Sequence, residues 1–176
     1  GTNGLAGFTV LSSLLSLLFI ALLFKDIEIA QIIFYFIFIL IAFLLLNYPF
    51  GKIFLGDLGA YFLGWFTGIM TILIMSRNPE IPNWNAVCIL CYPIIEVIFS
   101  FIRKIYKKRN PIYPDKEHLH LKLYFILSGK INNPTIANSL VAPFLASIWM
   151  MPLVVLPWIY LSKFLIFLAI FIQVVL

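Results

Sequence analysis

The sequence predicts an all-α membrane protein with about six membrane-spanning helices, and three observations support this fold class. Of the 176 residues, 63% are hydrophobic and only 11% are charged, with a mean hydropathy of +1.07, whereas soluble domains carry about 25% charged residues. Apolar runs close to the length of a bilayer crossing recur along the chain. The basic residues gather in one segment. We find no soluble domain and no linker, so residues 1–176 are treated as one integral membrane domain.

The first three helices are predicted from apolar runs that short polar segments separate. A helix over about 8–24 ends at the charged turn 25–28, and a second helix over about 29–46 ends before Asn47. A third run covers about 60–75. Each is near the roughly 20 residues that a crossing helix needs.

Three further helices are predicted over about 84–102, 136–159 and 164–176. The first of them ends where the basic residues begin. The second contains Pro152 and Pro157, so we expect a kink or a break there. The third is the shortest run.

The basic residues predict the orientation. Eight of the twelve Lys and Arg residues lie between positions 103 and 130, which makes a loop of about 103–134 cytoplasmic by the positive-inside rule. Alternation through the helices then puts 47–58 and the N-terminal segment on the same side. Every polar cluster that could do chemistry therefore falls on the cytoplasmic face.

Asp57 is the most informative polar residue of the segment 47–58. It is a lone carboxylate among apolar residues, close to the start of a predicted span, where acidic residues are costly and usually functional. Gly56 and Gly59 remove side-chain bulk beside it, and a carboxylate with open space suits Mg²⁺, which takes one or two carboxylates plus substrate phosphates. The alternative is an interfacial Asp that pairs with Lys52 or caps the next helix.

A stripe of small residues follows Asp57 on the same helix, at Gly56, Ala60, Gly64 and Gly68. This spacing is typical of a face that lets another helix approach closely. We interpret it as structural. The partner helix could belong to the same chain or to a second copy in a homodimer.

His118 and His120 are the only histidines of the chain. Two residues apart, they would diverge on a helix but share a face on an extended segment, which Pro111 and Pro114 just upstream favour. Histidines with nearby carboxylates can bind a diphosphate or move protons. The alternative is two solvated loop histidines.

Two features near the fourth predicted helix remain open between roles. The basic run 103–109 could attract a nucleotide diphosphate or a lipid phosphate, or act only as a topology signal against anionic headgroups. Glu96 lies seven residues before Arg103, on nearly the same helical face. We expect it to be a buried acid that pairs with an Arg or a polar neighbour rather than a catalytic group.

Three segments together resemble the polyprenyl-phosphate N-acetylhexosamine-1-phosphate transferase family of bacterial membrane enzymes. Gly-Thr-Asn-Gly-Leu-Ala-Gly at 1–7 is similar to the end of the family's Asn-x-x-Asp-Gly-x-(Asn/Asp)-Gly-Leu-Ala-Gly motif. The segment 47–64 resembles its Asn-x-Pro-x-x-x-x-Phe-Leu-Gly-Asp-x-Gly-x-x-x-Leu-Gly motif, and 114–120 resembles its Pro-Asp-Arg-x-His-Leu-His-His loop. The resemblance covers residues 1 to about 125.

The resemblance implies a reaction at the cytoplasmic face of the bacterial inner membrane. An oxygen of polyprenyl (undecaprenyl) phosphate attacks the β-phosphate of a UDP-N-acetylhexosamine, UMP leaves, and the polyprenyl-diphosphate sugar stays in the lipid bilayer. The implied cofactor is Mg²⁺, with Mn²⁺ as the alternative ion, and no nucleic-acid partner is expected. The predicted site residues are Asp57 as the metal ligand, His118 and His120 as catalytic residues, and Asn3, Asn47, Arg103 and Asp115 as substrate-binding residues.

The chain also departs from the family pattern. Leu121 stands where many members have another His, and Glu96 stands where an Asp is commoner. The chain opens at Gly1 without the family's N-terminal half and its paired aspartates. We therefore expect a C-terminal half that is inactive by itself.

Alternatives to this function lie inside and outside the family. The branch that transfers phospho-N-acetylmuramoyl-pentapeptide typically has consecutive histidines, whereas Leu119 separates His118 from His120, which favours the GlcNAc-type branch. A transporter would place polar residues near the bilayer midplane, where only Glu96 comes close. A structural subunit or a non-catalytic relative is the remaining alternative.

Overall fold

The computed structural model describes residues 2–108, 118–149, 160 and 162–175. These residues form helices and no strands, which confirms the predicted all-α fold. The helices are α1 (Leu5–Leu23), α2 (Ile27–Asn47), α3 (Gly56–Arg77), α4 (Trp84–Ile89), α5 (Cys91–Tyr106), α6 (Leu119–Ser128), α7 (Pro134–Trp149) and α9 (Lys163–Val175).

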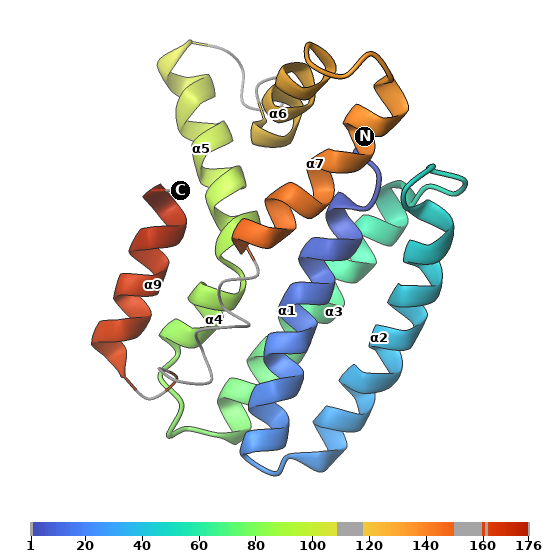
Figure 1. The fold of residues 1–176 in the computed structure, drawn as a ribbon. Coiled ribbons are helices and arrows are strands. Elements are labelled where there is room, and N and C mark those ends of the chain that lie inside the picture. The colour runs from blue at the N-terminus through green and yellow to red at the C-terminus, as the bar shows by residue number, and fades with distance from the viewer. Residues whose placement is uncertain (1, 109–117, 150–159, 161, 176) are drawn as a thin grey trace.

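Helices α1, α2 and α3 are each long and apolar enough to cross a membrane. They lie side by side, with α1 packed against both neighbours (Figure 1). The packing between them is close, because Leu14 and Leu17 of α1, Ile33 of α2 and Ile74 of α3 are completely buried. The remaining helices are arranged around this three-helix unit.

The shorter helices cover the other side of α1. Helix α7 packs on α1 and α6, and α9 packs on α4 and α5 (Figure 1). The N-terminal segment, the turn between α2 and α3, the end of α5 and helix α6 all lie at the same end of the molecule (Figure 1). This arrangement agrees with the predicted gathering of the polar clusters on one face.

The predicted helix over 84–102 is divided into α4 and α5 at Leu90. The break has a local cause. Pro93 has no N–H with which to bond the carbonyl of Ile89 four residues earlier. That carbonyl instead accepts a hydrogen bond from the Ser13 hydroxyl of α1, at 3.2 Å.

Two other predicted boundaries differ from the structure. The segment 103–134, predicted as a loop, contains the last turn of α5 and the whole of α6. The predicted helix over 136–159 corresponds to α7 as far as Trp149, and the predicted kink at Pro152 and Pro157 lies outside the described residues. Helix α6 has only ten residues and is flanked by charged residues, so the sequence does not mark it as a membrane-spanning helix.

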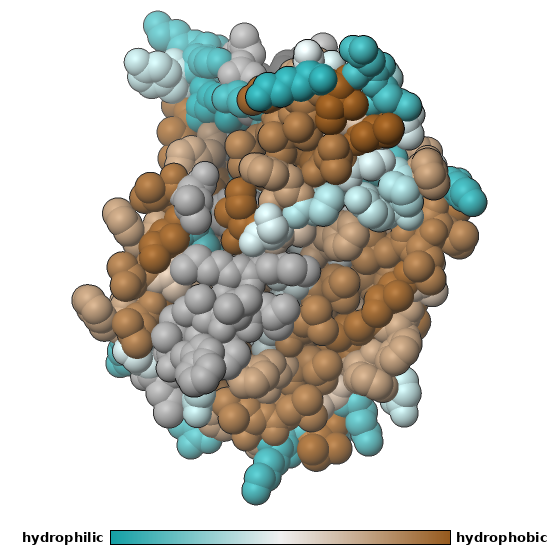
Figure 2. All heavy atoms as spheres, in the orientation of Figure 1, coloured by the Kyte–Doolittle hydropathy of each residue, from teal (hydrophilic) through white to brown (hydrophobic). Residues whose placement is uncertain are grey.

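The outer surface carries many exposed apolar side chains. Figure 2 shows hydrophilic residues mainly at the two ends of the molecule and hydrophobic residues over the band between them. On α2 and α3 the exposed residues include Phe38, Leu45, Tyr61 and Trp65. In water such a band would be strongly unfavourable, so the chain is a multi-pass membrane protein whose helices present this band to lipid.

Candidate functional site

Asn47, at the end of α2, ties three segments together at the polar end of the helices. Its side chain is buried, and its Oδ1 accepts a hydrogen bond from the backbone N–H of Gly4 at 2.7 Å. Its Nδ2 donates to the carbonyl of Ile53, also at 2.7 Å. The amide therefore holds the start of α1 against the turn between α2 and α3.

Asn3 supports the same turn from the N-terminal side. Its Nδ2 donates to the carbonyl of Pro49 at 2.9 Å, and the Ser139 hydroxyl of α7 donates to that carbonyl at 2.6 Å. Gly51 packs directly on Asn3: its φ is +62°, and a Cβ there would come within 2.7 Å of the Asn3 Oδ1. A glycine is needed at this position for both reasons.

Asp57 differs from these two amides because it is exposed. In the described part of the chain it forms no ion pair with Lys52 and no cap on α3, so neither alternative interpretation is realised. It lines a cavity of about 320 Å³ together with Asn3, Asn47 and Gly56. Three of the predicted site residues, Asn3, Asn47 and Asp57, therefore line one cavity. The Asp57 carboxylate remains accessible there.

The donor set around Asp57 fits a magnesium ion that is held largely by its substrate. Among the described residues no three Asp, Glu, His or Cys side chains lie close enough to form a metal cage. Mg²⁺ is usually bound by one or two carboxylates plus phosphates and water rather than by such a cage. A single accessible carboxylate is compatible with that mode of binding.

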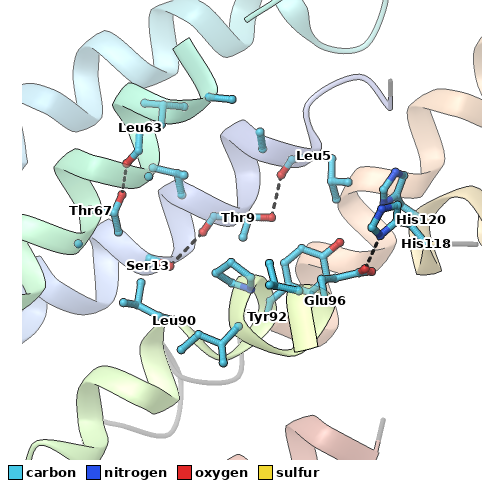
Figure 3. Close-up of a pocket in the computed structure, with 18 of the residues that line it drawn as sticks. Leu5, Thr9, Ser13, Leu63, Thr67, Leu90, Tyr92, Glu96, His118 and His120 are labelled. Atoms are coloured by element: carbon cyan, nitrogen blue, oxygen red, sulfur yellow. Dashed lines mark hydrogen bonds and ion pairs between the residues drawn. The ribbon is translucent and has the colours of Figure 1, made fainter. Parts of the chain in front are cut away.

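A second cavity, of about 710 Å³, adjoins the first. Leu5 and Ala6 of α1 line both cavities, and the larger one continues between α1, α3 and α5 (Figure 3). Its lining is mainly apolar. Ala60 and Gly64 of α3 also line it, three and seven residues after Asp57 and so on nearly the same helical face.

The small-residue stripe of α3 faces this larger cavity instead of another helix. A Cβ built at Gly64 or Gly68 meets no atom within 4 Å among the described residues. The predicted helix-packing role is therefore not realised within the described part of the chain. The absent side chains instead widen the space beside α3.

His118 and His120 lie together at the polar end of the larger cavity, as Figure 3 shows. His118 is the N-cap of α6 with an extended backbone, and His120 is in the first turn of that helix. The change of backbone between them lets the rings stack, with centroids 5.3 Å apart and planes 13° from parallel. The predicted shared face is confirmed, although only His118 is extended.

Glu96 of α5 is the partner of this histidine pair. Its Oε2 lies 2.9 Å from Nδ1 of His118, and its Oε1 accepts a hydrogen bond from the backbone N–H of Leu119 at 3.2 Å. Sequence reading anticipated a polar partner for Glu96 but did not identify His118, which is 22 residues away. No signal in the sequence links the two, because the pairing depends on how α6 folds back onto α5.

Burial distinguishes His120 from an ordinary surface histidine. Desolvation lowers the pKa of His120, with the nearby charge of Glu96 opposing this effect and His118 adding to it. Its buried Nδ1 has no hydrogen-bond partner among the described residues. The ring is therefore favoured in its neutral form.

Arg103 lines neither of these cavities. It lies on α5 beside a smaller cavity of about 230 Å³, which it shares with Glu96, Lys122 and Gln173. Asp115 lies outside the described residues. The substrate-binding roles predicted for Arg103 and Asp115 remain predictions, as do the roles of the other site residues.

Comparison with known proteins identifies relatives of this chain. Residues 1–75 match the family model described as glycosyl transferase family 4. An undecaprenyl-phosphate α-N-acetylglucosaminyl 1-phosphate transferase of Thermotoga maritima is 34% identical over 83 residues, which are 47% of this chain and 27% of that protein. A probable undecaprenyl-phosphate N-acetylglucosaminyl 1-phosphate transferase of Bacillus subtilis is 34% identical over 140 residues, covering 77% of this chain and 37% of that protein.

A third relative represents the other branch. The phospho-N-acetylmuramoyl-pentapeptide-transferase of Lactococcus lactis subsp. cremoris is 31% identical over 110 residues, 62% of this chain and 32% of that protein. The chain thus spans about a quarter to two fifths of the length of these relatives. No solved structure matches it. The predicted family resemblance is confirmed: through residues 1–75, this chain is related to glycosyl transferase family 4.

Proposed function

We propose that the complete gene product containing this chain transfers N-acetylhexosamine-1-phosphate from a UDP-sugar to polyprenyl phosphate. UMP is released, and the product begins a cell-envelope glycan on the cytoplasmic side of a bacterial inner membrane. The observation that carries the proposal is the placement of Asp57, an exposed carboxylate in a cavity that it shares with Asn3 and Asn47 and that adjoins a large apolar one. The names of the relatives supply the substrate class.

The two adjoining cavities suit the two ends of a lipid phosphate. The apolar cavity of about 710 Å³ offers space for isoprene units along α3, where Gly64 and Gly68 present no side chain. The smaller cavity, which Asn3, Asn47 and Asp57 line, would receive the phosphates. Such a division keeps the reacting phosphate near the polar end of the helices while the tail stays in apolar surroundings.

In the transfer, an oxygen of polyprenyl phosphate forms a bond to the β-phosphorus of the UDP-sugar, and the bond from that phosphorus to the bridging oxygen breaks as UMP leaves. Such reactions depend mainly on positioning and on neutralising phosphate charge. Asp57 would hold Mg²⁺, which supplies that neutralisation when bound. Asn3 and Asn47 bond the backbone of the turn before Asp57, and His118 and His120, which line the larger cavity beside α6, would contact the diphosphate from that side.

The first test uses membranes that contain the complete gene product, either wild type or Asp57→Asn. They receive labelled UDP-GlcNAc, polyprenyl phosphate and Mg²⁺, and both lipid-extractable label and UMP are measured. Because the carboxylate would bind the ion that neutralises phosphate charge, the substitution should lower the rate by about 10²–10³-fold. Glu80→Gln, an exposed acid between α3 and α4 at the opposite end of the molecule, is the matched control and should leave the rate unchanged.

Substrate choice is tested in the same membranes. The relative from Lactococcus lactis favours the muramoyl-pentapeptide branch as the second candidate, and UDP-MurNAc-pentapeptide replaces UDP-GlcNAc in that arm. Lipid product from the pentapeptide substrate alone would select the second branch. No lipid product from any UDP-hexosamine, with the protein folded and inserted, would overturn the proposal and favour a transporter or a non-catalytic relative.

A further inference from the structure

The Glu96 carboxylate has both of its oxygens engaged by groups from another helix. Oε2 lies 2.9 Å from Nδ1 of His118, and Oε1 lies 3.2 Å from the backbone nitrogen of Leu119. An ionised carboxylate only accepts hydrogen bonds, so with Glu96 ionised the proton between Glu96 and His118 belongs to Nδ1. The pair thereby fixes one tautomer of the imidazole, as carboxylates do for histidines at many reactive sites.

The contact with Glu96 also determines which ring nitrogen of His118 is available to another partner. In the neutral tautomer with Nδ1 protonated, Nε2 carries a lone pair that points away from Glu96. The hydrogen bond to Glu96 uses Nδ1 of His118 and leaves Nε2 for another partner. The ring lines the large cavity, and stacking on His120 restricts its rotation.

Both members of the pair are partly buried, and both line the large cavity. The Glu96 side chain is 18% exposed and the His118 side chain 30%, so the histidine is the more accessible of the two. Figure 3 shows Glu96 entering from α5 and the two rings standing at the end of the cavity. The acid is placed to act on the histidine and the histidine to act on a ligand.

We propose that Glu96 is a positioning residue that holds His118 in the Nδ1–H tautomer and presents Nε2 to the phosphates of the substrates. The catalytic meaning of this inference rests on the proposed transferase function. Glu96 acts through His118 and does not itself touch the reacting atoms.

Glu96→Gln tests the role because an amide cannot replace both acceptors. Its single oxygen can serve either His118 or Leu119 but not both, and its NH₂ can face Nδ1 only if the proton moves to Nε2. The kcat should fall about 10–100-fold, the usual range for losing a carboxylate that orients a histidine, while KM for the UDP-sugar changes less than threefold. An unchanged kcat would overturn the proposal.

A double-substitution cycle separates positioning from a merely structural role. If Glu96 acts through His118, adding Glu96→Gln to His118→Ala should cost nothing further in kcat. Equal losses in the presence and absence of His118 would show that Glu96 only braces α5 against α6. The Glu80→Gln control removes a carboxylate far from the site and should leave both backgrounds unchanged.

The tautomer is measured directly by nitrogen-15 NMR of histidine-labelled wild-type protein in lipid at pH 8. The His118 signals are assigned by their loss in His118→Asn. An unprotonated nitrogen resonates far downfield of an N–H nitrogen, so Nε2 should give the downfield signal and Nδ1 the other. The reverse assignment would overturn the inference whether or not the protein is active, whereas absent activity with the expected tautomer would count against the proposed function alone.

Discussion

Two polar corners at the same end of this molecule use their side chains in different ways. In the turn corner, formed by Asn3, Asn47 and Asp57, both amides bond backbone groups and the carboxylate is uncommitted. In the histidine corner, formed by Glu96, His118 and His120, each carboxylate oxygen lies at hydrogen-bond distance from a nitrogen of α6 or its N-cap, and the buried Nδ1 of His120 has no partner among the described residues. A carboxylate is thus a candidate metal ligand in the turn corner and a structural group in the histidine corner.

The hydrogen bonds that a side chain already makes distinguish structural residues from candidate ligands better than the residue type does. Asn47 matches a family motif residue, yet its amide is used to join α1 to the turn between α2 and α3. Asp57 is the group that this scaffold leaves accessible. Removing a side chain that bonds the backbone should therefore lower stability more than removing the exposed Asp57 carboxylate does.

Asn47→Ala should have the largest effect on stability. It leaves the buried N–H of Gly4 without its partner, which costs about 1–3 kcal/mol, whereas the carbonyl of Ile53, an exposed residue, can bond water instead. We expect the free energy of unfolding to fall by about 1–3 kcal/mol for this reason. Denaturant unfolding of the purified protein in detergent measures the change, with Asp57→Ala as the exposed control that should lose less than about 0.5 kcal/mol. If both variants lose the same free energy of unfolding, Asn47 has no greater structural role than Asp57 in the turn corner.

The sequence alone predicted one corner better than the other, for a physical reason. Asn47 and Asp57 are ten residues apart, so a single turn and the start of one helix bring them together. Glu96 and His118 are 22 residues apart, and their contact requires the fold of α6 against α5. The break at Leu90 was missed as well, because the apolar run continues through it and only Pro93 marks it.

A substitution in the larger cavity between the two corners should have smaller effects. It should raise the stability of the protein but weaken the binding of polyprenyl phosphate. Gly64→Ala adds a methyl group that meets no atom within 4 Å, and Ala in place of a mid-helix Gly usually stabilises by about 0.5–1 kcal/mol. If the polyprenyl tail lies along this stripe, the methyl group should raise KM for polyprenyl phosphate a few-fold.

Gly7→Ala is the matched control on α1, because its Cβ would lie 2.5 Å from Cδ2 of Leu44. It should lower the Tm instead of raising it. Thermal unfolding of both variants measures the Tm, and steady-state kinetics measure the KM for polyprenyl phosphate. An unchanged KM in Gly64→Ala would move the tail away from α3.

The smallest predicted effect concerns His120 and the stability of the histidine corner with pH. Helix α6 is not one of the three helices long enough to cross a membrane, and burial lowers the pKa of His120 below its ordinary value of 6.5. The unfolded chain therefore binds a proton at a higher pH than the folded chain does. Stability from this group is fully present above about pH 7 and is lost as the pH falls through 6.5 toward the lower folded value. The Tm of the wild type should drop more than that of His120→Gln between pH 7.5 and pH 5.5. Parallel curves of Tm against pH would mean that the His120 ring is solvated in the membrane-embedded protein. The two corners would then differ only in the hydrogen bonds that their carboxylates accept.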